Sequence, residues 1–185
     1  MKLHILGKIL KSDSKAIAVV GSRLMSPRGE ALTKKFVKEF VKGGYTIVSG
    51  LARGIDTVAH QTALRQGGRT IAVLGSGLDI IYPSENIALA EKIIKSGALV
   101  SPYLNGTKPF PKNFLARNRT IVELSKAVLI VEGKARSGTL STASWAANAG
   151  IDVYAIPGSE ATDWLIGEGA NSVKSPKEVI DKIWI

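Results

Sequence analysis

Short hydrophobic runs alternate along this chain with longer segments whose hydrophobic residues recur at helical spacing. Leu32, Phe36 and Phe40 are typical of the second kind and predict a helix that packs on a sheet through one face. Runs that are hydrophobic at nearly every position predict strands buried on both faces, as in a parallel sheet. These runs cover residues 16–20, 45–48, 70–74, 98–100, 127–131 and 152–156. The alternation predicts an α/β fold with a doubly wound, mostly parallel sheet and crossover helices.

Glycines mark the places where the predicted helices end. Gly43–Gly44, Gly67–Gly68, Gly97 and Gly150 each separate a helical segment from the following strand. We expect a left-handed backbone there, because glycine adopts that conformation without steric cost.

The chain length suits one well-buried domain. We expect residues 1–185 to form a single, extended Rossmann-like domain. Residues 1–14 form the lead-in, with an edge strand over 3–8, and residues 171–185 form a C-terminal tail with a short helix after Pro176.

The composition excludes several classes of site. The chain has no cysteine, which excludes disulfides and thiolate metal sites, and its two histidines, His4 and His60, are isolated in the sequence. We therefore expect no metal. No hydrophobic run approaches the roughly 20 residues of a membrane span, and the first residues lack the pattern of a signal peptide. These features predict a cytoplasmic protein that binds no membrane.

Positive charge favours a polyanionic partner. Lys and Arg number 25 and Asp and Glu number 15, which gives a formal net charge of +10. Between Lys108 and Arg136, cations outnumber the acids Glu123 and Glu132. A concentrated basic segment of this kind is typical of proteins that bind nucleic acid.

Small, glycine-rich loops follow the predicted strands at residues 21–23, 49–56, 75–77 and 137–139. In an open α/β sheet, ligands bind beyond the carboxyl ends of the strands, where such loops meet. Backbone amides, hydroxyls and helix N-termini can bind an anion there, and Arg23 and Arg53 add positive charge. The chain contains no G-x-G-x-x-G pattern after the first strand and no G-x-x-x-x-G-K-[ST] pattern, so a dinucleotide or P-loop site lacks its residues.

The segment 110–119 combines cations, two aromatic residues and an amide with Pro111, which can open a helix. These residue types can hold a phosphate backbone while an aromatic ring stacks on a base. An ordinary amphipathic helix with a charged face explains the same segment, because Arg117 and Arg119 lie about 200° apart on a helical wheel. On this segment alone we favour the amphipathic-helix interpretation.

An acid and a histidine at helical spacing raise the question of catalysis. Asp56 and His60 stand four residues apart, which suits a structural pair as well as a general base. Asp56 can instead accept a hydrogen bond from the start of its own helix, the interpretation that we favour. No Ser, His and acid form a recognisable nucleophile site.

Ordered motifs along the chain resemble those of the DprA/Smf DNA-processing family. They lie in order from about residue 16 to residue 170, which makes the series more specific than any single motif. The motifs are 21–23, 49–56 with Ala59-His60, 75–79 with Tyr82-Pro83, 114–119, 137–140 with Thr142-Ala143, and 156–158.

The resemblance implies a non-catalytic protein without cofactors that binds single-stranded DNA and passes it to a RecA-type recombinase during natural transformation. It also implies a homodimer. Arg23 is expected at a backbone phosphate, Phe114 against a base, and Lys112 at the pocket wall. Arg117 shares a helix face with Phe114 and is expected to contact DNA, whereas for Arg119 a structural role stays open beside a DNA contact. The implied DNA-binding residues are Gly21, Ser22, Arg23, Ser49, Gly50, Arg53, Lys112, Phe114, Arg117, Asn118, Arg119, Ser137, Gly138 and Thr139.

Two features differ from the family pattern. Members commonly carry a small helical domain before the core and often a winged-helix-like domain after it, whereas this chain begins almost at the first strand and ends soon after the last helix. The loop between Gly158 and Trp164 is also shorter than usual.

Two alternatives have a similar core. Phosphoribohydrolases of the cytokinin-activating type carry a P-G-G-x-G-T-x-x-E loop with a catalytic Glu. Residues 135–142 align with that loop and place Thr142 where the Glu stands, and a hydroxyl cannot replace a carboxylate in that role. The second alternative is a small nucleotide-sensing module.

Overall fold

The computed structural model describes residues 2–135 and 137–183, so Arg136 of the basic segment lies outside the described residues. Within them, eight strands form one sheet in the order β1-β5-β4-β3-β2-β6-β7-β8. All neighbouring strands are parallel except β1, which pairs antiparallel with β5. The strands are β1 His4–Gly7, β2 Ala16–Val20, β3 Thr46–Ser49, β4 Thr70–Val73, β5 Ala98–Ser101, β6 Ala127–Ile130, β7 Asp152–Ala155 and β8 Asn171–Ser172.

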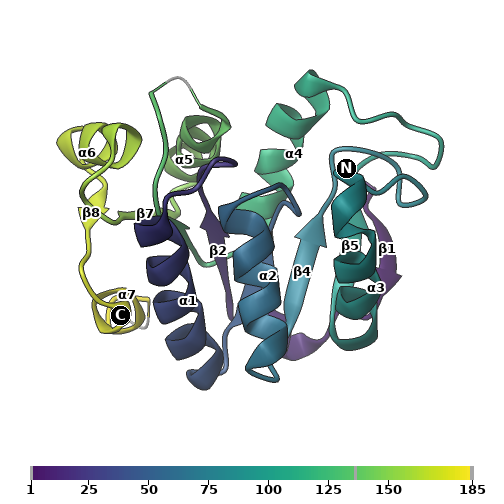
Figure 1. The fold of residues 1–185 in the computed structure, drawn as a ribbon, viewed down its shortest axis with the longest axis horizontal. Helices are drawn as coiled ribbons and strands as arrows, with labels where there is room; N and C mark the ends of the chain where they lie inside the picture. Colours follow the sequence, from purple (N-terminus) through teal and green to yellow (C-terminus); the bar gives the residue numbers. More distant parts are fainter. Residues whose placement is uncertain (1, 136, 184–185) are drawn as a thin grey trace.

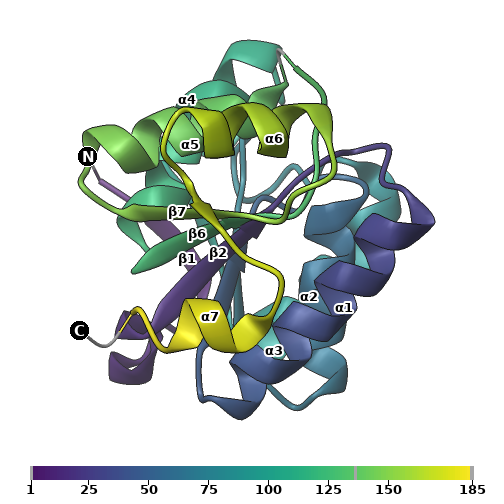
Figure 2. The same cartoon turned by 90° about the vertical axis from the view of Figure 1, so that its left-hand side faces the viewer.

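Helices cover both faces of the sheet (Figures 1 and 2). One layer contains α1 Pro27–Lys42, α2 Ile55–Arg65 and α3 Ile87–Ser96, and the other contains α4 Pro111–Glu123, α5 Gly138–Asn148 and α6 Glu160–Gly167. The short helix α7 Pro176–Ile180 packs beside α1. This arrangement confirms the predicted doubly wound fold.

Strand β2 shows why nearly continuous hydrophobicity was needed. Ile17 and Val19 belong to the core cluster that contains Phe36 of α1, whereas Ala18 and Val20 belong to the cluster on the other face, and all are buried. Successive strand side chains point to opposite faces, so a strand covered on both sides has no polar face.

Two local expectations differ from the structure. Gly44, Gly67 and Gly150 have positive φ, but Gly97 has φ −155°. A Cβ at Gly97 would lie 1.9 Å from the Thr70 carbonyl oxygen, so close approach to β4, and not a left-handed turn, requires glycine there. The predicted helical tail begins instead with strand β8, which pairs with β7 before α7 starts.

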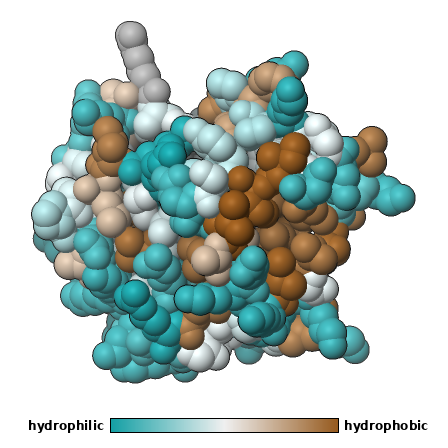
Figure 3. Space-filling model, turned by 45° about the vertical axis from the view of Figure 1, so that its right-hand side comes forward, coloured by the Kyte–Doolittle hydropathy of each residue, from teal (hydrophilic) through white to brown (hydrophobic). Residues whose placement is uncertain are grey.

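The sheet edge at β1 exposes apolar side chains. Ile5, Leu6, Ile9 and Leu10 on and after this strand are each more than two-fifths exposed. Figure 3 shows hydrophobic residues gathered on the side of the molecule that β1 and α3 occupy. Among the described residues, no helix is long and apolar enough to cross a membrane.

The chain order places a switch point at β2. The strand lies between β3, reached through α1, and β6, which comes much later in the chain. Helices that leave neighbouring strands toward opposite faces open a crevice beyond the carboxyl ends of the strands, where ligands bind in this architecture.

Candidate nucleic-acid interface

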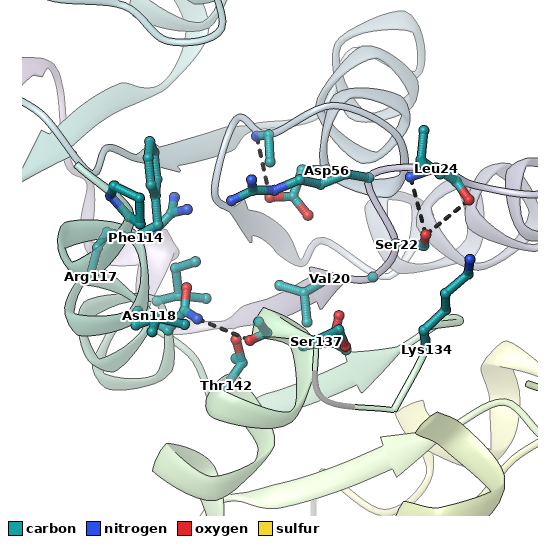
Figure 4. Close-up of a pocket in the computed structure, with 18 of the residues that line it drawn as sticks. Val20, Ser22, Leu24, Asp56, Phe114, Arg117, Asn118, Lys134, Ser137 and Thr142 are labelled. Atoms are coloured by element: carbon teal, nitrogen blue, oxygen red, sulfur yellow. Dashed lines mark hydrogen bonds between the residues drawn. The ribbon is translucent and has the colours of Figure 1, made fainter. Parts of the chain in front are cut away.

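A cavity of about 520 Å³ lies at this crevice. The end of β2, one face of α4 and the N-terminus of α5 form its walls (Figure 4). Its volume suits a small ligand or one nucleotide of a longer strand. Predicted site residues on its wall are Gly21, Ser22, Arg23, Phe114, Arg117, Asn118, Ser137, Gly138 and Thr139.

The loop after β2 is held in one conformation and presents Arg23. The Ser22 amide donates to the Glu132 carbonyl oxygen at 3.0 Å, and the Ser22 hydroxyl both donates to and accepts from the backbone of Leu24. Arg23 itself is exposed, and it takes part in no ion pair between described residues. Its guanidinium carbon lies 5.4 Å from the centre of the Phe114 ring. Arg23 is therefore a cation available to an anionic ligand.

Phe114 stands on the first turn of α4, which Pro111 opens. The ring is partly exposed and lies over Gly75, where an added Cβ would come within 2.6 Å of the ring Cδ1 atom. Gly75 and its neighbours Ser76 and Gly77 are buried, so the loop at 75–77 supports the ring and does not present amides to a ligand as the sequence predicts.

Tyr82 extends the aromatic surface, and the sequence analysis did not assign it a role. Its ring centre lies 5.5 Å from that of Phe114, with 44° between the ring planes. The Arg53 guanidinium lies 5.9 Å from the Tyr82 ring, and it also pairs with Glu85. The two rings thus lie side by side between two cations, in the order Arg53, Tyr82, Phe114, Arg23. In the sequence, only the place of Tyr82-Pro83 within a family motif indicated that Tyr82 belongs to the site.

Arg117 lies beneath Phe114 and bonds to the protein itself. It is 3% exposed, and its Nη1 atom donates to the Gly50 carbonyl oxygen at 2.6 Å and to the Val73 carbonyl oxygen. Burial lowers the pKa of Arg117 to about 10, and the nearby Asp56 carboxylate acts in the opposite direction. These contacts join α4 to the ends of β3 and β4. The sequence predicts a DNA contact for Arg117. In the structure its Nη1 atom bonds within the fold, whereas its buried Nε atom has no hydrogen-bond partner among the described residues, and the side chain lines the cavity.

The other α4 residues divide between surface and interior. Lys112 and Arg119 are exposed, and Arg119 pairs with Glu123 at 2.7 Å and lies over Trp145. Asn118 is buried and donates from Nδ2 to the Gly138 carbonyl oxygen at 3.2 Å. Neither Lys112 nor Arg119 is among the residues that line the cavity.

The loop at 49–56 has a structural role at its first two residues. Ser49 is fully buried and donates to the Val19 carbonyl oxygen at 2.7 Å, and Gly50 is buried against Arg117. Within this loop only Ala52 and Asp56 line the large cavity. Ser49 and Gly50, both predicted as binding residues, are therefore not in contact with it.

Asp56 and His60 form no hydrogen bond to one another among the bonds of the described residues. Asp56 accepts hydrogen bonds from the amides of Gly50 at 3.0 Å and Ala52 at 3.4 Å. It therefore bonds to the preceding loop, whereas the sequence predicts a bond to the start of its own helix. Burial raises the pKa of Asp56 despite the nearby Arg117. His60 is paired with the Thr70 hydroxyl at 2.7 Å, and burial lowers its pKa to about 3. His60 is a neutral core residue.

Known proteins share both this sequence and this fold. A family model described as DNA recombination-mediator protein A matches residues 1–184. Protein Smf of Synechocystis sp. is 46% identical over 188 residues, which cover 96% of this chain and 47% of that protein. DNA processing protein DprA of Streptococcus pneumoniae is 44% identical over 170 residues, covering 89% of this chain and 60% of the other. The chain spans about half the length of the Smf proteins that it matches.

Solved structures agree. DprA from Streptococcus pneumoniae superposes with a TM-score of 0.91 at 41% identity, over 97% of this chain and 65% of that one. DNA processing protein A from Helicobacter pylori, whose structure is described as giving insight into its single-stranded DNA binding mode, superposes with a TM-score of 0.89 at 30% identity, over 98% and 86% of the two chains. A molybdenum cofactor carrier protein from Chlamydomonas reinhardtii, at 14% identity and a TM-score of 0.64, shares the fold alone. The chain belongs to the DNA recombination-mediator protein A family, that of the DprA and Smf DNA-processing proteins.

Proposed function

We propose that this protein binds single-stranded DNA, with Arg23 at a backbone phosphate and Phe114 against an unpaired base. The observation that carries the proposal is the row of cations and aromatic rings at the mouth of the cavity. Base stacking on aromatic side chains beside a cationic groove is a common means of binding single strands. The Helicobacter pylori relative, described as binding single-stranded DNA, supports the same use of this fold.

Each rim residue has a distinct task in this proposal. Gly75 and Tyr82 hold one side of the Phe114 ring, so the ring is oriented before a base arrives. Arg117 is a positioning residue that fixes α4 to the sheet from below. Lys112 and Arg119, both exposed on α4, add long-range attraction for the phosphate backbone.

The cellular role follows from the family and is part of the proposal. We propose that the protein acts in the cytoplasm in DNA processing and recombination, passing single-stranded DNA to a RecA-type recombinase during natural transformation. We propose further that it works as a homodimer, without catalysis and without a cofactor. The match to the DNA recombination-mediator model and to DprA proteins supports this role.

The test compares a 20-nucleotide single strand with the duplex of the same length by fluorescence anisotropy. Single strands should bind more tightly, because Phe114 can stack only on an unpaired base while phosphate contacts serve both forms. Phe114→Ala should weaken single-strand binding and bring it close to duplex binding. Phe110→Ala is the matched control, since Phe110 is exposed at the start of the same helix and does not line the cavity. Equal affinity of the parent for both forms contradicts the stacking role.

A phosphoribohydrolase is the second candidate, because Asp56 places one carboxyl on the cavity wall. Thr142, at the position of the catalytic Glu in that class, is 2% exposed on the same wall. Because Asp56 is already bonded to backbone amides, we expect no base release from nucleoside monophosphates when products are separated by chromatography. Turnover that survives repurification and disappears in Thr139→Val would show that the cavity is an active site.

A further inference from the structure

The end of the cavity away from Phe114 is formed by the first turn of α5. The helix spans Gly138–Asn148, and its N-cap residue Ser137 makes no side-chain capping bond. The Ser137 hydroxyl is buried and has no hydrogen-bond partner among the described residues. Gly138 has no side chain between its amide and the cavity, and a Cβ there would meet only a side-chain atom of Leu115 at 3.9 Å. The helix N-terminus, with its partial positive charge, is open to a ligand.

Two buried threonines point to a ligand independently of the helix end. Thr139 is 6% exposed and Thr142 is 2% exposed, and both line the cavity. Their hydroxyls take part in no hydrogen bond between described residues, although Thr33, equally buried on α1, bonds to the Gly29 carbonyl oxygen. Neither hydroxyl oxygen is among the buried atoms that lack a partner, so both reach the cavity and can donate to a ligand or to water there.

We propose that this end of the cavity is a subsite for a phosphate monoester, the 5′-phosphate of a nucleotide whose base lies toward Phe114. The nucleotide is either free or the 5′-terminal nucleotide of a strand. The inference rests on the proposed function, because it uses the same aromatic rim for the base.

Charge favours a monoester over the phosphodiester of an internal nucleotide. A monoester carries nearly two negative charges at neutral pH, with a second pKa near 6, whereas a backbone phosphate carries one. The α5 N-terminus and the cavity-lining cation Lys134 both attract that charge. The hydroxyls of Ser137, Thr139 and Thr142 can donate to the three terminal oxygens that only a monoester has.

Helices α4 and α5 are joined beside this subsite. Asn118 of α4 donates to the Gly138 carbonyl oxygen of α5 at 3.2 Å, which joins the two helices. Thr142 lies next to this contact (Figure 4), and Ile121 of α4 also lines the cavity. A strand that enters past Phe114 therefore meets a wall between α4 and α5, as suits a terminal nucleotide.

The experiment compares hexathymidylate carrying a 5′-phosphate with the same oligonucleotide carrying a 5′-hydroxyl, by isothermal titration calorimetry with the full chain. The 5′-phosphate should tighten binding about tenfold, the effect of one or two hydrogen bonds to a charged group. Thymidine 5′-monophosphate should compete for the site, and thymidine should not. The gain from the phosphate should shrink when the pH falls from 7.5 to 5.5, because the monoester loses its second charge.

Three variants distinguish binding of the 5′-phosphate at this subsite from general electrostatic attraction. Thr139→Val keeps the shape of the side chain and removes the hydroxyl, so it should reduce the gain from the 5′-phosphate severalfold. Ser137→Ala should act in the same direction. Ser141→Ala is the matched control, since Ser141 is on the same helix and outside the cavity lining, and it should leave the gain unchanged.

The outcomes are distinguishable. Tighter binding of the 5′-phosphorylated oligonucleotide assigns the subsite to strand ends. Competition by thymidine 5′-monophosphate without that tighter binding assigns the subsite to free nucleotides. Both results support the inference. Equal affinity of the two oligonucleotides together with no competition by the monophosphate overturns it and leaves the proposed function standing. Competition by inorganic phosphate as strong as that by the monophosphate also overturns the nucleotide assignment. Failure of both oligonucleotides to bind contradicts the proposed function itself.

Discussion

Replacing Arg117 by Met tests whether this cation supports the fold or contacts DNA. The guanidinium is 3% exposed and donates to the carbonyl oxygens of Gly50 and Val73. Met retains most of the apolar length of the side chain and removes the charge. Two buried carbonyl groups then lose their donors, and Asp56 loses the cation nearest to it in the interior.

The structure sets the size of the effect. Hydrogen bonds from a charged group contribute about 1.5–3 kcal/mol each, and removing one member of a buried charge pair costs about 3–5 kcal/mol. We therefore expect Arg117→Met to lower the free energy of unfolding by about 3–5 kcal/mol at pH 7. That loss is a large part of the stability of an ordinary domain.

The loss should depend on pH in a definite direction. Burial already raises the pKa of Asp56 in the folded protein, and Arg117 opposes that rise. A carboxyl whose pKa is higher in the folded than in the unfolded protein stabilises the fold at pH values below the unfolded pKa. That contribution is lost as the pH rises through the pKa of the folded state. Without Arg117 the folded pKa of Asp56 rises further, so Arg117→Met should be more destabilising at pH 8 than at pH 5.

Urea unfolding at both pH values measures the effect, with Arg119→Met as the matched control. Arg119 is on the same helix but exposed, with a surface pair to Glu123, so its replacement should cost less than about 1 kcal/mol. DNA affinity of folded Arg117→Met is then measured against salt. If Arg117→Met is nearly as stable as the parent, and its slope of log affinity against log salt concentration falls by about 0.7, Arg117 is a phosphate ligand and its structural role is refuted.

Three further predictions concern the rim and the core. Arg23→Ala should lower the slope of log affinity against log salt concentration for a single strand by about 0.7. Phe114→Ala should weaken binding by about 1–3 kcal/mol and leave that slope nearly unchanged. The opposite pattern in a salt titration would show that the two roles are misassigned. Tyr82→Ala should weaken single-strand binding less than Phe114→Ala, because Tyr82 supports the ring from one side, and a pair of anisotropy titrations decides this. Asp13 is buried beside Arg69, and although burial raises its pKa, hydrogen bonds from Arg69, Leu10 and Thr46 hold that pKa below 3.8. Asp13→Asn should therefore cost about 1.5–3 kcal/mol at pH 7, and its difference from the parent should shrink as the pH falls from 3.8 through the lower folded pKa of Asp13; a cost that stays constant over this range contradicts the ion pair.

Periodicity was sufficient to predict the layers of this protein. Residues such as Ile17 and Ala18 of β2 are both hydrophobic because each faces a different helix layer, and that requirement is visible in the sequence. The connection of parallel strands by helices follows from the same pattern. Strand β8 could not be predicted, because a strand over Asn171–Ser172 is too short to show an alternation.

The binding site was predictable only in part. The strand pattern indicated that the loops at residues 21–23, 49–56, 75–77 and 137–139 meet at one edge, because the carboxyl ends of parallel strands lie together, whereas only the family motifs indicated that α4 joins them. The sequence also marked Phe114 and Arg23 through the family motifs, and the structure brings them within 5.4 Å.

The tertiary structure alone decided which of the neighbouring polar residues face the cavity and which face the core. The spacing of Arg117 and Arg119 shows that they point in different directions, but only the packing of α4 on the sheet shows that Arg117 is the buried one. Tyr82 meets Phe114 from a segment distant in the sequence, so no local pattern reports their contact. Local spacing therefore determined the elements and their order, whereas burial and partners depend on contacts between distant segments, which exist only once the chain has folded.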